Sequence, residues 1–99
     1  MTGRHGEEIA AAHLRRSGYR ILGRNVRTFR GEVDLIAEQE GTIVFVEVKA
    51  RTRSDAFAPS ARIDYRKVER LRHAAELWLE ERRGRGEGEI PARVDVIGV

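Results

Sequence analysis

The sequence contains no cysteine, which excludes disulfide bonds, thiolate zinc sites and cysteine nucleophiles. Any bound metal must therefore rely on carboxylates or histidine. No apolar run approaches the roughly 20 residues that a membrane-spanning helix needs, and residues 1–6 lack the apolar segment of a secretory signal. We expect a cytoplasmic protein with no part in the membrane.

Lysine is also scarce in this sequence. Only two of the 19 cationic residues are lysine, Lys49 and Lys67, and the others are arginine. Where arginine supplies a generic positive charge, the remaining lysines can mark positions that need a compact, deprotonatable ammonium group. The formal net charge of +3 and the pI of about 9.9 suit a polyanionic partner. A solvated surface of mixed charge explains them equally well.

Length and composition indicate one globular domain. A chain of 99 residues is too short for two independent cores, so we expect a single domain over 1–99. Its content of 40% hydrophobic and 35% charged residues is typical of a soluble domain rather than of a disordered or membrane protein.

The apolar residues follow helical spacing in some segments of the chain and the spacing of strands in others. Helical spacing that ends before Gly18 and before Gly84 predicts two helices, and Asp64 is suited to cap the second. The run 52–63, rich in small residues, is expected to be a mobile flap. The predicted elements are a helix over 6–17, strands over 19–27, 32–38 and 42–51, a helix over 65–83 and a strand over 93–99. Together they predict an α/β fold around one mixed sheet.

Carboxylates interrupt the second and third predicted strands. If residues 40–41 form a two-residue turn, counting outward places Asp34 opposite Glu47, and Glu32 opposite Lys49. Directly opposed residues of an antiparallel pair share a face, so two carboxylates converge. Their repulsion and desolvation require a compensating cation. Lys49 can supply it, and so can a divalent ion that prefers oxygen ligands, Mg²⁺ or Mn²⁺.

A purely structural interpretation of these charges stays open. The carboxylates can be edge-strand charges that discourage aggregation, or Lys49 can form an ion pair with Glu47 or Glu32. The uninterrupted apolar run 43–46 implies that the third strand is buried on both faces. The register itself depends on the assumed turn.

Two motifs resemble a known protein family. The runs GEVDLIA over 31–37 and VFVEVKAR over 44–51 closely resemble the UPF0102 family, also called the YraN-like proteins. That family is similar to archaeal Holliday junction resolvases and to the wider PD-(D/E)xK superfamily. The resemblance implies a restriction-endonuclease-like αβββαβ core, a mixed sheet flanked by helices. Family members commonly continue past the last strand, so the resemblance also implies that a short C-terminal segment is missing here.

The resemblance further implies a metal site. In that superfamily an acidic residue of the first helix, a strand aspartate and a Glu-x-Lys motif surround Mg²⁺ or Mn²⁺. By matching position, the implied catalytic residues are Glu7, Asp34, Glu47 and Lys49. The implied metal ligands are Glu7, Asp34, Glu47 and the backbone carbonyl of Val48.

Cationic residues around the predicted flap are candidates for contacts with nucleic acid. Lys67 resembles the polar residue that the superfamily often carries on the second helix, and arginines on either side of the flap could flank a groove. They could equally be ordinary surface residues. The candidates are Arg51, Arg53, Arg62, Arg66, Lys67 and Arg70.

The function that the resemblance implies is a metal-dependent endonuclease that cuts DNA phosphodiester bonds, with branched DNA suggested by the resolvases. DNA is favoured over RNA, and resolvase activity would need two sites and hence a homodimer. Two other interpretations remain open. One is a non-catalytic nucleic-acid-binding module in repair, recombination or transformation, and the other is a protein-interaction domain that pairs through its last strand.

Overall fold

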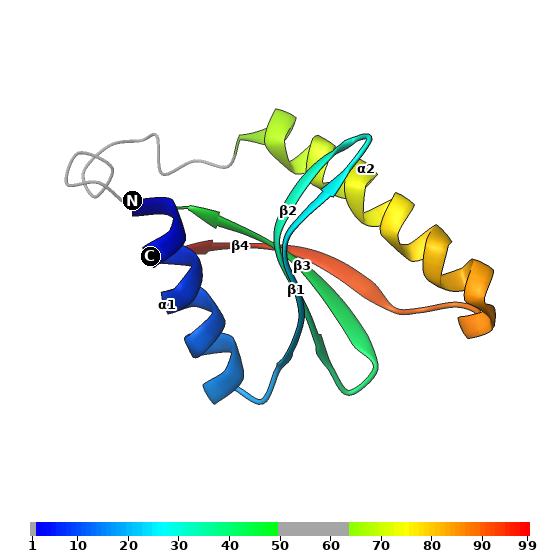
Figure 1. Ribbon diagram of the computed structural model, residues 1–99, viewed down its shortest axis with the longest axis horizontal. Coiled ribbons are helices and arrows are strands. Elements are labelled where there is room, and N and C mark those ends of the chain that lie inside the picture. Colours follow the sequence, from blue (N-terminus) through cyan, green and yellow to red (C-terminus); the bar gives the residue numbers. More distant parts are fainter. Residues whose placement is uncertain (1, 50–63) are drawn as a thin grey trace.

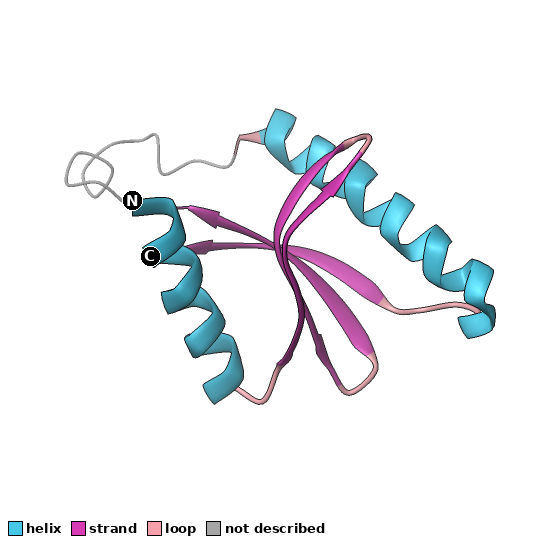
Figure 2. Cartoon of the chain, viewed as in Figure 1, coloured by secondary structure: helices cyan, strands magenta, loops and turns pink. Residues whose placement is uncertain are grey.

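The computed structural model describes residues 2–49 and 64–99, which form a four-stranded mixed sheet between two helices (Figures 1 and 2). The element order confirms the predicted α/β fold class, and it is the arrangement expected of a restriction-endonuclease-like core. The elements are α1 (Thr2–Arg16), β1 (Arg20–Thr28), β2 (Gly31–Gln39), β3 (Thr42–Lys49), α2 (Tyr65–Arg82), the short π-helical turn η2 (Arg83–Glu87) and β4 (Ala92–Gly98).

The strands lie in the sheet in the order in which they occur in the chain, β1-β2-β3-β4. The first three are antiparallel to one another, whereas β4 runs parallel to β3. A parallel neighbour requires a long crossover, and α2 lies in that connection. Both β2 and β3 therefore have a strand on each side, and β1 and β4 form the two edges.

Each helix covers one face of the sheet, as Figure 1 shows. The small residues Ala10 and Ala11 of α1 are fully buried, which lets this helix lie close to the strands. The run 43–46 of β3 is buried on both faces, as its sequence predicted. The face under α1 contains Leu35, Ala37, Val44 and Val46, and the face under α2 contains Val33, Ile36, Ile43 and Phe45.

Local signals placed most of the element ends correctly. Gly18 has a φ of +91°, and Tyr19 N–H donates to the Leu14 carbonyl at 2.9 Å, which ends α1 where predicted. The Asp64 carboxylate accepts a hydrogen bond from Arg66 N–H at 3.0 Å and caps α2. The first helix begins at Thr2, four residues earlier than predicted.

The alternation in β2 is less regular than its sequence suggests. Val33 and Ile36 are three residues apart, yet both belong to the core cluster under α2. Strict alternation, which would separate them, therefore does not hold through this part of the strand. The irregular part lies opposite Asn25 of β1, whose φ of 49° is left-handed. The predicted flap over 52–63 lies outside the described residues.

Candidate metal site

The hairpin that carries the acidic residues has the predicted turn. Glu40 and Gly41 have φ values of 53° and 84°, and Gln39 pairs with Thr42, as a two-residue turn with positive φ requires. From there the ladder between β2 and β3 runs to the pair Leu35–Val46. The assumed turn was correct, and it fixes which residues meet along the hairpin.

The two strands part at the acidic residues. Among the described residues, the β2–β3 ladder ends one pair before Asp34 and Glu47. Beyond that point β3 keeps pairing with β4, as far as the pair Lys49–Gly98. The two predicted pairs beyond this point, Asp34 with Glu47 and Glu32 with Lys49, are therefore not part of the β2–β3 ladder. The separation of the strands leaves space between their backbones for polar side chains.

Asp34 fills part of this space. Its Oδ2 accepts a hydrogen bond from the backbone N–H of Val48 at 2.8 Å. The carboxylate thus replaces the backbone carbonyl that a continued β2–β3 ladder would have offered to this N–H group. The contact holds the carboxylate of Asp34 beside β3, close to Glu47. The sequence had suggested only the carbonyl of Val48 as a functional group.

The surroundings of the two carboxylates raise their pKa values. Partial burial raises the pKa of Asp34, the Val48 hydrogen bond opposes this, and Glu32 adds to the increase. Burial also raises the pKa of Glu47, and the neighbouring charge of Asp34 raises it further. Lys67 lowers both pKa values, and Arg70 lowers that of Glu47. The first turns of α2 therefore supply positive charge to the carboxylate pair.

We expect Glu47→Gln to stabilise the metal-free protein at pH 7 by about 0.5 kcal/mol, within the range for opposed like charges. This would raise the melting temperature by roughly 2–4 °C. Because the folded-state pKa of Glu47 is raised, the contribution of this carboxyl group to wild-type stability is fully present below the ordinary glutamate pKa. That contribution is lost as the pH rises through the folded-state pKa.

Thermal melts in a chelator at pH 7 and near pH 4 test this expectation. The advantage of Glu47→Gln should be present at pH 7 and shrink at the lower pH, where the wild-type carboxyl is also neutral. The facing groups are Asp34, Glu32, Lys67 and Arg70, so Lys67→Met in the wild-type background serves as a control and should destabilise at pH 7. If Glu47→Gln were less stable than wild type at pH 7, the predicted repulsion between Glu47 and Asp34 would be contradicted.

The interpretation of the carboxylates as edge-strand charges is wrong, because β2 and β3 are both interior strands. Half-buried charges inside a sheet do not protect an edge. Burial raises the pKa of both carboxyl groups, so keeping them ionised at neutral pH is expected to cost stability in the absence of a bound cation. Such a cost is typical of residues that have another role.

Of the other predicted site residues, Glu7 lies on α1 and Lys49 lies on β3. Glu7 is half-buried in α1, and its neighbour Gly6 packs against the end of β3, since a Cβ on Gly6 would lie 3.6 Å from Val48 Cγ1. Lys49 is half-buried and follows Glu47 at the spacing that shares a strand face. Within the part of the chain that the structure describes, no three His, Asp or Glu side chains come close enough to hold one metal ion.

The candidate nucleic-acid residues are only partly described. Arg66, Lys67 and Arg70 are exposed on the first turns of α2. Of these, Lys67 and Arg70 act electrostatically on the carboxylate pair. The predicted candidates in the flap region lie outside the described residues. These are Arg51, Arg53 and Arg62.

Neither α1 nor α2, as far as they are described, is long and apolar enough to cross a membrane.

Comparison with known proteins gives a consistent family assignment. The model of uncharacterised protein family UPF0102 matches residues 6–99. A UPF0102 protein of Persephonella marina is 41% identical over 99 residues, which cover 100% of this chain and 83% of that protein. One of Clavibacter michiganensis is 44% identical over 100 residues, covering 98% and 80% of the two chains. The resemblance seen in the strand motifs is thereby confirmed over nearly the whole sequence, and the chain belongs to the uncharacterised protein family UPF0102.

Proposed function

We propose that this protein is a metal-dependent endonuclease that cleaves phosphodiester bonds of DNA. One observation carries the proposal. Two half-buried carboxylates, Asp34 and Glu47, lie where the interior strands β2 and β3 part, and cations of α2 face them. This combination supplies oxygen ligands for a divalent ion together with positive charge for a phosphate.

The residues present fit Mg²⁺ or Mn²⁺. Hard cations of this kind are commonly held by one or two carboxylates together with water and substrate phosphate oxygens. Asp34 and Glu47 would be those carboxylates, and the family resemblance adds Glu7 and the carbonyl of Val48 as further ligands. When bound, such an ion lowers the pKa of a water molecule and offsets negative charge on the phosphate.

The side chains of this protein would position the substrate. The Val48 N–H fixes the carboxylate of Asp34 at 2.8 Å, so this ligand is held in place before a metal arrives. Lys67 and Arg70 offer positive charge to an approaching phosphate from the first turns of α2. Lys49, on the same strand as Glu47, would stabilise the charge that develops on the phosphate during cleavage.

Cleavage of labelled DNA tests the proposal. Linear duplex, single-stranded, flapped and four-way junction substrates would be incubated with Mn²⁺ and, in parallel, with EDTA. We expect cutting that requires the metal, with branched substrates preferred, as the resemblance to resolvases suggests. A preference for RNA would change the substrate class, and an absence of cutting on every substrate would refute the nuclease proposal.

A non-catalytic nucleic-acid-binding module is the second candidate. It is favoured because, among the described residues, no three acidic or histidine side chains are grouped closely enough to hold a metal ion. In this case binding would be strongly salt-dependent and would survive the loss of Glu47, because the phosphate contacts would depend on arginine and lysine. Salt-dependent binding without cutting would support this candidate.

A further inference from the structure

The β1–β2 hairpin presents an aromatic side chain at its tip. Among the described large hydrophobic residues, Phe29 is the most exposed, at 104% of its reference area. A single exposed apolar residue is common on protein surfaces and needs no explanation by itself. Phe29, however, lines a groove, and it sits on a turn that contains several hydrogen bonds. Both features suggest a binding role.

Hydrogen bonds hold this turn in one conformation. The hydroxyl oxygen of Thr28 accepts from the N–H groups of Arg30 and Gly31, each at 3.1 Å, and the hydroxyl donates to the Gly31 carbonyl at 2.8 Å. Gly31 has a φ of +149°, and a Cβ there would lie 3.6 Å from the Arg70 carbonyl of α2. The tip is therefore seated against the helix, which fixes the backbone that carries Phe29.

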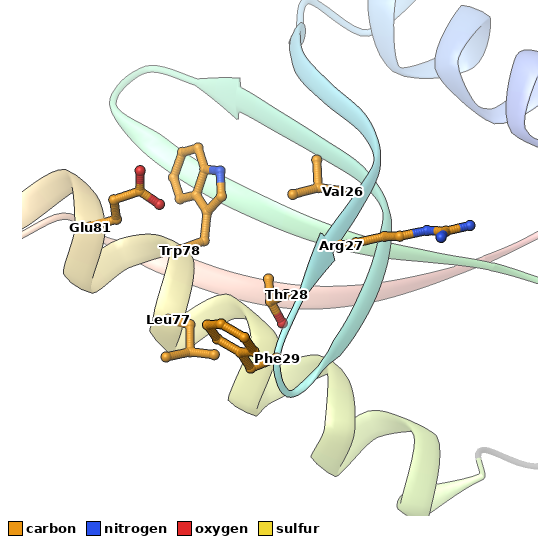
Figure 3. Close-up of a pocket in the computed structure, with 7 residues that line it drawn as sticks. All are labelled: Val26, Arg27, Thr28, Phe29, Leu77, Trp78 and Glu81. Atoms are coloured by element: carbon orange, nitrogen blue, oxygen red, sulfur yellow. The ribbon is translucent and has the colours of Figure 1, made fainter.

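Between the tip and α2 lies a groove of about 490 Å³ (Figure 3). Its wall is mainly apolar, with Val26 and Phe29 from the hairpin and Leu77 and Trp78 from the helix. Trp78 packs edge-on against Phe45, with ring centroids 5.6 Å apart, so this part of the wall is anchored in the core. A groove with a rigid aromatic floor and an exposed aromatic rim suits a flat ring.

The charged residues near the groove indicate which kind of aromatic ligand it would bind. Arg24, Arg27 and Arg30 are exposed on the same hairpin, and the side chain of Arg27 keeps 87% of its area accessible although its Nε lies 3.6 Å from a Glu32 carboxylate oxygen. Glu81 is the acidic residue among those that line the groove. The side chain of Arg27 extends away from Trp78 and Phe29 (Figure 3), so it would meet a phosphate outside the groove. Exposed arginines on the hairpin that carries an aromatic groove suit a ring that is attached to phosphates.

We propose that this groove binds an unpaired base of a nucleic acid, stacked on Phe29, with Arg27 and Arg30 contacting the flanking phosphates. The proposal deepens the nuclease proposal and rests on it for the kind of partner. Gly31 is three residues from Asp34, about 10 Å along the strand. Arg70 both supports the tip and faces Glu47. A strand leaving the groove would thus need only a few nucleotides to reach the carboxylates.

Equilibrium binding in EDTA tests the inference without any cleavage. Fluorescence anisotropy would compare a labelled duplex that carries a short single-stranded flap with the fully paired duplex. We expect Phe29→Ala to weaken binding of the flapped DNA by at least about 5-fold, the lower range for loss of one base stack. Binding of the paired duplex should change by less than about 2-fold. Phe29→Trp should retain wild-type affinity, because it keeps an aromatic face.

Ile9→Ala is the matched control, because Ile9 is also an exposed apolar residue, at 44%, but lies on α1 across the sheet. It should leave both affinities unchanged. Equal affinity of Phe29→Ala and wild type for flapped DNA would overturn the inference. So would a Phe29→Ala variant that lost only self-association in ultracentrifugation, because the tip would then be a protein contact.

The failure of this inference can be told apart from the failure of the nuclease proposal. Metal-dependent cutting combined with base binding that ignores Phe29 would overturn the groove assignment alone. Phe29-dependent binding of unpaired DNA by a protein that cuts nothing would support the groove and refute the nuclease. Because the binding assay contains EDTA, the two results are independent.

Discussion

Replacing Glu47 by glutamine is expected to reduce Mn²⁺-dependent DNA cleavage by about 10²–10³-fold, the range found when one group that stabilises transition-state charge is removed. Glutamine keeps the length of the side chain and its half-buried position but loses the negative charge that a divalent ion needs. The positive charges of Lys67 and Arg70 remain in place. Binding of DNA in EDTA should therefore persist and can become tighter, since one repulsive charge is gone.

A matched glutamate on α2 provides the control for this experiment. Glu69 is exposed and pairs with Arg72 at 3.1 Å, so Glu69→Gln removes the same charge from a solvated position. Its cleavage rate should stay within about 2-fold of wild type, because an exposed ion pair contributes little free energy. Full activity of Glu47→Gln, measured on protein purified alongside wild type, would place the cutting at a different site or in a contaminant.

Replacing Phe45 by alanine is expected to destabilise the fold by about 3–5 kcal/mol. Phe45 is fully buried in β3 and meets Trp78 of α2 edge-to-face at 5.6 Å. Removing its ring would leave a cavity between the sheet and α2 and would also remove the ring contact of Trp78. Because small domains have total stabilities of about 5–15 kcal/mol, the variant would be close to unfolding. Its melting temperature should fall by at least about 12 °C.

The same substitution at the hairpin tip is the control. Phe29→Ala removes an identical ring from a fully exposed position, so stability should change by no more than about 0.5 kcal/mol. Urea unfolding followed by circular dichroism measures both variants. Similar losses at the two positions would mean that Phe29 is packed in solution, which would contradict the exposed tip and its role in binding.

These expectations describe one trade-off in the molecule. Partial burial raises the pKa values of Asp34 and Glu47, so holding these carboxylates ionised within the sheet is expected to cost stability. The stability comes instead from the apolar residues around them, of which Phe45 is the largest that is fully buried. A Glu47→Gln variant that is both more stable and inactive would fit the common pattern in which active sites sacrifice stability.

Much of the fold followed from the sequence because the signals were local. Gly18 ended the first helix through its left-handed backbone, and Asp64 capped the second through its own side chain. The turn at 40–41 set the hairpin register, since a two-residue turn allows few alternatives. The apolar run 43–46 predicted a strand that is covered on both faces. Each of these depends on residues within a few positions of one another.

The tertiary structure decided what happens at the site itself. Counting outward from the turn put Glu32 opposite Lys49, but β2 and β3 part before that point. The separation occurs where β4, some fifty residues further along the chain, continues to pair with β3 while β2 does not. It exposes the Val48 N–H to which Asp34 binds. The irregular alternation between Val33 and Ile36 lies in the same part of β2.

The sequence by itself determined which residues of this protein can carry chemistry, the order of its elements and the family to which it belongs. Only the tertiary structure decided how Asp34 is oriented, which cations of α2 face Glu47, and that the tip with Phe29 closes a groove against α2. The reason is physical. Helix caps, turns and apolar periodicity arise from neighbouring residues, whereas these contacts join elements that become neighbours only when the sheet and its two helices pack together.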